Sequence, residues 1–199
     1  TLNIVEADSS YREWTRETMQ EQYRTLLGHF RHESGHYYFD RLIENTKWHQ
    51  PFKTLFDDDE QDYQAALDRH YQHGAPSDWQ QHYVSSYASM HPWEDWAETW
   101  AHYLHMMDTI DTAYHSGVNI QPYNRVEPHM ALSVSPIGNP DFEQTLLDWF
   151  ALSYALNSLN RSMGLIDAYP FVLSQLVLQK LRFIHQVIME NIQISIAAA

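Results

Sequence analysis

Two histidines in this sequence have a spacing that suits a shared metal ion. Residues 32–36 read H-E-S-G-H, an H-E-x-x-H pattern inside a helix-like run from Leu26 to Ile43. Residues four apart on a helix lie on the same face, so His32 and His36 can bind one tetrahedral Zn²⁺. The intervening Glu33 can reach a water held by the metal. The pattern therefore predicts hydrolytic zinc chemistry with Glu33 as the general base.

A catalytic zinc site needs a third protein ligand and an open fourth position. The metzincin pattern would require glycine at position 39 and histidine at position 42, and Phe39 and Leu42 exclude it. The segment EDWAE offers Glu94 and Glu98, which are four residues apart and share one helix face. One carboxylate can bind the metal, and the other can accept the remaining N–H of a ligand histidine.

Two segments carry a resemblance to known proteins. HESGHYY (residues 32–38) and YASMHPWEDWAETWAHY (residues 87–103) resemble the bacterial zinc-binding metallopeptidase family. The likeness extends to TLNIVEAD at the start, to LLGHFRHE, and to LNRSMG and AYPF near the end. The two motif regions are also distantly similar to the catalytic domain of anthrax lethal factor, and both groups belong with the gluzincins.

This resemblance implies roles for three further residues. In the lethal-factor pattern a tyrosine lies seven residues before the ligand glutamate, and a second glutamate lies four residues after it. By that pattern Glu94 is the third zinc ligand and Glu98 is the supporting acid. Tyr87 is implied as the hydrogen-bond donor to the transition state. Family members often carry an upstream cysteine-rich zinc-ribbon segment, which this sequence lacks.

Length and periodicity predict one domain over residues 1–199, α+β and mostly helical, with a small sheet. The resemblance implies a zincin-like fold. We expect the peptide substrate to lie extended along an edge of that sheet. The expected elements are strands at 1–7 and 130–134, a loop at 48–59, and helices at 63–73, 93–113, 141–162 and 172–194. Residues 11–44 are expected to form two helices bent near Gly28.

Composition narrows the classes of partner that the protein is expected to bind. The net charge of −14 leaves no basic stripe for nucleic acid. No apolar run approaches the roughly 20 residues that span a bilayer. The absence of cysteine and of a recognisable signal peptide predicts a cytoplasmic protein. The sequence therefore predicts a peptide or protein substrate and leaves oligomeric state undetermined.

Several alternatives stay open at this stage. A pair of surface histidines near acidic residues would also match H-E-x-x-H, Glu98 competes with Glu94 as ligand, and Tyr87 could be a core tyrosine. His29, His102 and Tyr169 receive no role. Two functions compete with a zinc peptidase: a zinc-containing module that binds peptides without cleaving them, and a zinc amidohydrolase with a non-peptide substrate.

Overall fold

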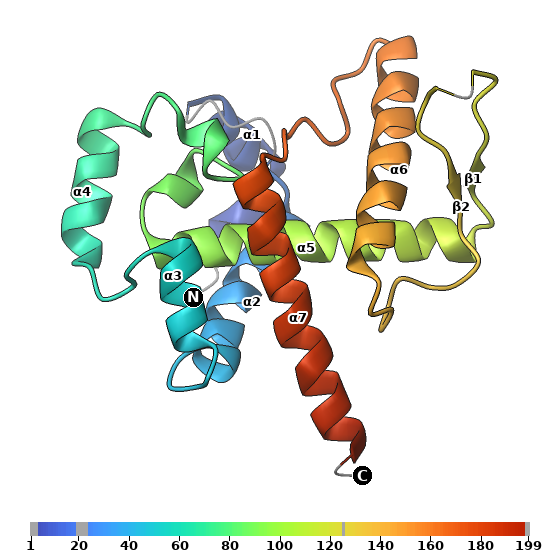
Figure 1. Ribbon diagram of the computed structural model, residues 1–199. Coiled ribbons are helices and arrows are strands. Elements are labelled where there is room, and N and C mark those ends of the chain that lie inside the picture. Colours follow the sequence, from blue (N-terminus) through green and yellow to red (C-terminus); the bar gives the residue numbers. More distant parts are fainter. Residues whose placement is uncertain (1–3, 19–23, 125, 198–199) are drawn as a thin grey trace. The chain divides into compact units, whose positions relative to one another are not determined.

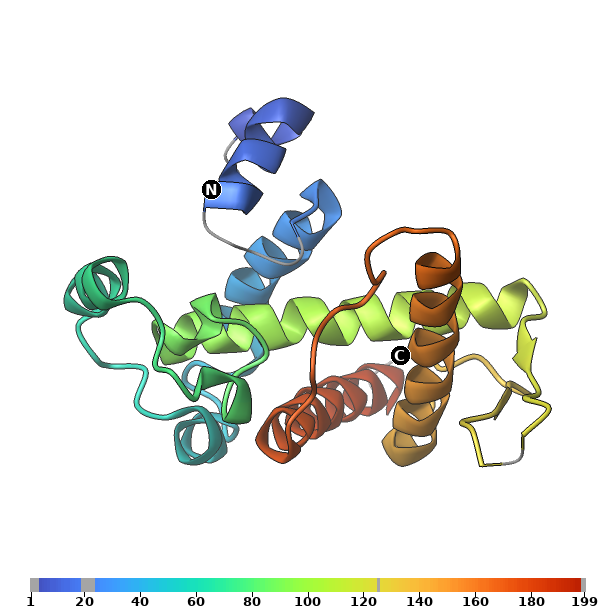
Figure 2. The same cartoon turned by 90° about the horizontal axis from the view of Figure 1, so that it is seen from above.

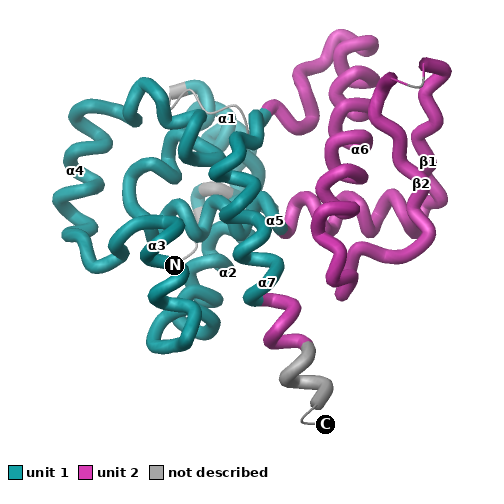
Figure 3. Tube along the Cα trace, viewed as in Figure 1, with its two compact units in different colours: residues 1–103, 171–187 teal, residues 104–170, 188–199 magenta. Residues whose placement is uncertain are grey.

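The protein is described here by a computed structural model, which covers residues 4–18, 24–124 and 126–197. The chain forms two compact units (Figure 3). Unit 1 consists of residues 1–103 and 171–187, and unit 2 consists of residues 104–170 and 188–199. Two long helices, α5 (Pro92–His115) and α7 (Gln175–Ala197), contribute residues to both units. The single domain expected from chain length stays a prediction.

In unit 1 the described elements are all helices, which are joined by loops. Its helices begin at residues that suit helix starts: the Thr25 hydroxyl accepts a hydrogen bond from the Gly28 N–H, and the Asp62 carboxylate accepts one from the Ala65 N–H. Besides parts of α5 and α7, the unit contains η1 (Ile4–Ala7), α1 (Ser9–Thr18), α2 (Leu26–Leu42), α3 (His49–Phe56), α4 (Tyr63–His73), η2 (Trp79–Gln81) and η3 (Tyr87–Ser89) (Figure 1).

An aromatic cluster forms the core of unit 1. The ring of Trp96, on α5, is fully buried and lies 6.1 Å between centroids from both Phe39 of α2 and Phe52 of α3. Phe56 stacks on Phe52 at 4.8 Å, and Phe183 of α7 lies 5.9 Å from Phe56. Burial of five large rings joins four helices and sets the position of α2 against α5.

Helices α2 and α5 cross at very close range (Figures 1 and 2). A Cβ added at Gly35 would lie 2.8 Å from Ala97 Cα, too close for any side chain. The Trp96 indole donates to the Gly35 carbonyl oxygen at 2.9 Å, and the Trp100 indole donates to Ser34 Oγ at 3.1 Å. Glycine in mid-helix costs about 1 kcal/mol in helix propensity. Here it lets the H-E-x-x-H helix contact α5 directly.

A buried ion pair joins α7 to the other side of α5. Lys180 is 2% exposed, and its ammonium donates to Asp95 Oδ2 at 2.6 Å and to the His82 carbonyl oxygen at 2.8 Å. Burial raises the pKa of the Asp95 carboxyl to about 6, against the opposing attraction of the Lys180 charge. Because Asp95 follows Glu94 in sequence, this pair helps to fix the rotation of α5 at the site described below.

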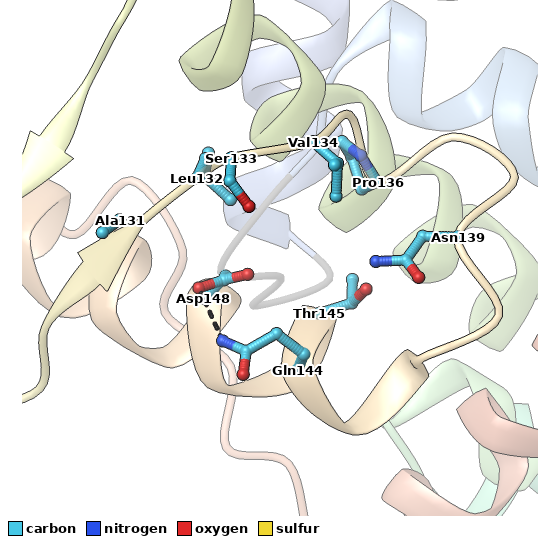
Figure 4. A pocket seen from close by; sticks show the side chains of 9 residues that line it. All are labelled: Ala131, Leu132, Ser133, Val134, Pro136, Asn139, Gln144, Thr145 and Asp148. Atoms are coloured by element: carbon cyan, nitrogen blue, oxygen red, sulfur yellow. Dashed lines mark hydrogen bonds between the residues drawn. The ribbon is translucent and has the colours of Figure 1, made fainter.

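Unit 2 contains the described strands. β1 (Asn119–Ile120) and β2 (Met130–Ala131) pair antiparallel, and α6 (Phe142–Ser162) begins at Asp141, whose carboxylate accepts a hydrogen bond from the Gln144 N–H. A polar hollow of about 310 Å³ lies between residues 131–139 and the first turns of α6, with Asp148 in its wall (Figure 4). None of the residues predicted to bind metal lines this hollow.

The mostly helical α+β prediction is confirmed, but two local predictions are wrong. Residues 4–7 form a 3-10 turn rather than a strand, and residues 1–3 lie outside the described part. The loop expected at 48–59 contains α3, whose Pro51 falls in the first turn, where proline is tolerated. The two helices predicted over residues 11–44 correspond to α1 and α2, and α2 begins at Leu26, two residues before Gly28. No described helix has the length and apolarity to cross a bilayer.

Candidate metal centre

Two imidazoles and one carboxylate meet where α2 crosses α5. The Nε2 atoms of His32 and His36 lie 3.1 Å apart. Glu94 Oε2 lies 3.0 Å from the His32 Nε2 and 3.4 Å from the His36 Nε2. Glu94 is 2% exposed, and both histidines are partly buried. The three residues are the set in the described chain whose ligand atoms could share one metal ion.

The spacing of these three atoms fits a tetrahedral zinc ion. Metal–ligand bonds of about 2.0–2.1 Å at tetrahedral angles place ligand atoms about 3.3 Å apart. The distances of 3.0, 3.1 and 3.4 Å agree with that value. Glu94 Oε2 is also buried with no well-aligned hydrogen-bond partner, which is costly for a carboxylate oxygen. A bound cation would satisfy this oxygen, so the residues present fit the metal.

Glu98 sits behind the first histidine. His32 Nδ1 lies 2.7 Å from Glu98 Oε1, and because a carboxylate can only accept, the Nδ1–H is the donor. In a neutral His32 this hydrogen bond leaves the lone pair on Nε2, the form in which an imidazole binds metal. The other oxygen of Glu98 accepts a hydrogen bond from the Ser85 hydroxyl at 2.6 Å. Glu98 therefore has the geometry of a supporting acid, and Glu94 that of a ligand.

Charge is unusually concentrated around these side chains. Burial lowers the pKa of His32, but Glu94 and Glu98 outweigh it and raise that pKa to about 10. Burial alone would raise the pKa of both carboxyls. The nearby histidines instead hold the pKa of Glu94 below its usual range, and His32 lowers the pKa of Glu98 to about 2. Both carboxylates are therefore ionised at neutral pH and can attract a cation.

Tyr63 contacts Glu94 and was not among the residues singled out from the sequence. It is the first residue of α4, and its hydroxyl donates to Glu94 Oε1 at 2.8 Å. Tyr87, the residue implied by the resemblance, lies with its ring centroid 6.1 Å from that of His32. Burial raises the pKa of Tyr87, as do the charge of Glu94 and a hydrogen bond with Tyr63. Both phenols are thus protonated donors beside the three ligand atoms.

The remaining predicted residues lie at different places. Glu33 follows His32 on α2 and is partly exposed, with its Oε1 3.8 Å from the His29 Nε2. His102 is 5% exposed and meets the ring of Phe171 edge-on at 4.4 Å. Tyr169 belongs to unit 2, where its backbone exchanges hydrogen bonds with the Asn157 side chain. Of these three residues, only Glu33 is next in sequence to a candidate metal ligand, His32.

Sequence spacing also misjudged one tryptophan and gave no sign of Ser85. Trp93, Trp96 and Trp100 form a helical stripe that predicts core packing. Trp96 and Trp100 are buried in that way, but Trp93 is half-buried and its ring lies 3.7 Å between centroids from the ring of His36. Trp93 thus restrains the second histidine. In the sequence, the sign that Trp93 lies near the site was its position one residue before Glu94.

Comparison with known proteins identifies the family. Residues 1–187 match the family described as "Putative zinc-binding metallo-peptidase". The chain therefore belongs to this family, which confirms the resemblance drawn from the two motif segments. The more distant resemblance to anthrax lethal factor is not shown by these comparisons, and no solved structure matches the chain.

Relatives of this chain occur in mycobacteria. An uncharacterized protein of Mycobacterium bovis and one of Mycobacterium tuberculosis are each 51% identical to it over 192 residues. The match covers 96% of this chain and 54% of each relative. The chain thus spans about half the length of the curated relatives it matches.

Proposed function

We propose that this chain is a zinc-dependent peptidase of the gluzincin type, with His32, His36 and Glu94 as metal ligands. The observation that carries the proposal is the meeting of two imidazole nitrogens and one buried carboxylate oxygen at 3.0–3.4 Å. Family membership supports zinc and peptidase chemistry. The crossing of the H-E-x-x-H helix with the glutamate helix supports a zincin-like fold.

Each side chain then has a separate task in peptide hydrolysis. When bound, zinc supplies Lewis acidity, which polarises the scissile carbonyl and makes water more acidic. Glu33 takes a proton from the attacking water as its oxygen bonds to the carbonyl carbon. Glu33 passes that proton to the amide nitrogen as the C–N bond breaks. Tyr87 donates a hydrogen bond to the developing oxyanion. Glu98 keeps the Nδ1 proton on His32.

The expectation that the peptide lies along a sheet edge stays a prediction. Extended peptides often bind by pairing with a strand at a sheet edge. The described residues of unit 1 contain no strand, and β1 and β2 both belong to unit 2. Within unit 1, the described residues therefore offer no strand edge to a peptide. Peptide recognition in unit 1 is expected from side chains on its helices.

The decisive experiment substitutes Glu33 with glutamine, which keeps the shape but cannot take a proton. Zinc-loaded Glu33→Gln should retain its metal and lose roughly 10²–10⁴-fold in the rate of cleavage of a fluorogenic peptide library. Glu44→Gln is the matched control, because Glu44 is exposed just after α2. Equal cleavage rates for wild type and zinc-loaded Glu33→Gln would remove Glu33 as the base.

The same library separates the competing functions. Chelation should abolish cleavage, and zinc should restore it. Wild-type protein that binds library peptides but leaves them intact would instead be a peptide-binding module. Protein that neither binds nor cleaves peptides but hydrolyses small amides would be an amidohydrolase.

A further inference from the structure

We propose that Tyr63 is a positioning residue that restricts Glu94 to binding metal through a single oxygen, Oε2. The inference rests on the proposed zinc site and adds a residue from α4, outside both motif segments. It names the coordination that the site should adopt: two imidazole nitrogens, one carboxylate oxygen and an open fourth position.

The two oxygens of Glu94 have different neighbours. Oε1 accepts a hydrogen bond from the Tyr63 hydroxyl at 2.8 Å. Oε2 faces the Nε2 atoms of His32 and His36 at 3.0 and 3.4 Å. Hydrogen bonds to an ionised carboxylate are among the stronger ones in proteins. A carboxylate that turned to offer both oxygens to a metal would have to weaken or break the bond from Tyr63.

Packing holds the Tyr63 ring in place for this task. Its centroid lies 5.3 Å from the ring of His91 and 5.9 Å from the ring of Trp93, both edge-on. Since Pro92 is the first residue of α5, these two rings flank the start of the helix that carries Glu94. Tyr63 is thus anchored to the element whose carboxylate it orients.

The proposal explains why α4 packs here. On this short helix Ala66 is the buried residue, and Tyr63, Leu67 and His70 are half-buried on the same face. His70 meets the ring of Tyr87 at 6.1 Å between centroids. The face of α4 turned toward the core therefore carries the phenol that meets Glu94 and the imidazole that meets Tyr87. Tyr71, four residues after Leu67, is 65% exposed.

Cobalt substitution tests the proposal directly. Co²⁺ replaces zinc in such sites, and four-coordinate Co²⁺ absorbs visible light several times more strongly than five- or six-coordinate Co²⁺. The full 199-residue chain should give the strong four-coordinate spectrum. Tyr63→Phe keeps the ring but removes the hydroxyl, so Glu94 becomes free to bind through both oxygens. Its cobalt spectrum should weaken, and its zinc affinity should fall roughly 10–100-fold in competition with a chelator.

Tyr71→Phe is the matched control, because Tyr71 lies on the same helix and is 65% exposed. It should keep the wild-type spectrum and affinity. A Tyr63→Phe protein indistinguishable from wild type in both measurements would overturn the proposal. A five- or six-coordinate spectrum in the wild-type protein would also overturn the proposal. This second measurement does not depend on whether Tyr63→Phe folds.

These outcomes separate Tyr63 from the peptidase proposal. A spectrum that changes on Tyr63→Phe in a protein without peptidase activity would support the coordination and contradict the function. A spectrum that does not change on Tyr63→Phe, in an active, zinc-dependent peptidase, would support the function and contradict the coordination. Wild-type protein that takes up neither metal would contradict both.

Discussion

Gly35→Ala should separate the two helices that supply the metal ligands. The added Cβ would lie 2.8 Å from Ala97 Cα, and 3.3 Å from both the carbonyl oxygen and Cβ of Ala97. Carbon atoms in contact favour separations of about 3.5–4.0 Å. The clash is with backbone, so rotation of a side chain cannot relieve it. Helices α2 and α5 must therefore move apart by roughly 0.7–1 Å at the crossing.

The expected effect is larger on zinc than on folding. Overpacking costs typically about 1–3 kcal/mol, and the better helix propensity of alanine returns about 1 kcal/mol. The net loss in the free energy of unfolding is therefore about 0–2 kcal/mol. The histidines move with α2 and Glu94 stays with α5, so their 3.0 and 3.4 Å separations widen toward about 4 Å. Zinc sites tolerate errors of about 0.2 Å in ligand distance.

Competition with a chelator measures the result, together with thermal unfolding of the metal-free proteins. Zinc affinity of Gly35→Ala should fall by at least the roughly 10–100-fold that loss of an outer partner causes. Asp40→Ala, at an exposed position of α2, is the control. Adding Ala97→Gly should not rescue binding, because the closest atom is Ala97 Cα. A folded Gly35→Ala protein with wild-type zinc affinity would refute the close crossing.

Three further predictions concern buried polar groups of unit 1. Glu94→Ala should lose nearly all zinc affinity, whereas Glu98→Ala should lose roughly 10–100-fold, as ranked by chelator competition. Burial lowers the pKa of His102 to about 4. His102 is therefore neutral in the folded protein, whereas in the unfolded chain it takes up a proton below about pH 6.5. The free energy of unfolding should have its full value above about pH 6.5 and should fall, by at most about 3 kcal/mol, as the pH drops toward 4. His102→Gln should flatten this loss in denaturant unfolding across pH. Lys180→Met should destabilise by about 3–5 kcal/mol because Asp95 stays buried without its partner, and adding Asp95→Asn should recover much of that in the same assay.

Each of these has a contradicting result. A greater zinc loss in Glu98→Ala than in Glu94→Ala would swap their roles and remove the role of Tyr87, which is counted back from Glu94. Parallel pH profiles for His102→Gln and the exposed control His73→Gln would show that His102 does not set acid stability. Failure of Asp95→Asn to improve Lys180→Met would show that the cost does not come from the unpaired carboxylate.

The sequence was most informative where chemistry depends on spacing within a helix. The i,i+4 relation of His32 and His36 and that of Glu94 and Glu98 each place two side chains on one face, and both helices exist. The close approach of α5 accounts for Gly35, a residue that is costly in mid-helix. These features depend on local backbone geometry, which the residue pattern determines.

Features formed by tertiary contact were not predictable in this way. Tyr63 meets Glu94 across 31 residues, and Ser85 meets Glu98 across 13, with no periodic relation to either motif. A tyrosine at a helix start and a serine in a loop are common in any sequence. The zincin-like sheet was expected by resemblance, and the described strands are the short β1 and β2.

The central claim is that one metal ion is held by residues from both α2 and α5. Metal analysis of the 199-residue chain, purified without added metal, tests it most directly. We predict about one zinc per chain in the wild type and none in either His32→Ala or His36→Ala. Full zinc content in both histidine variants would contradict the site described here.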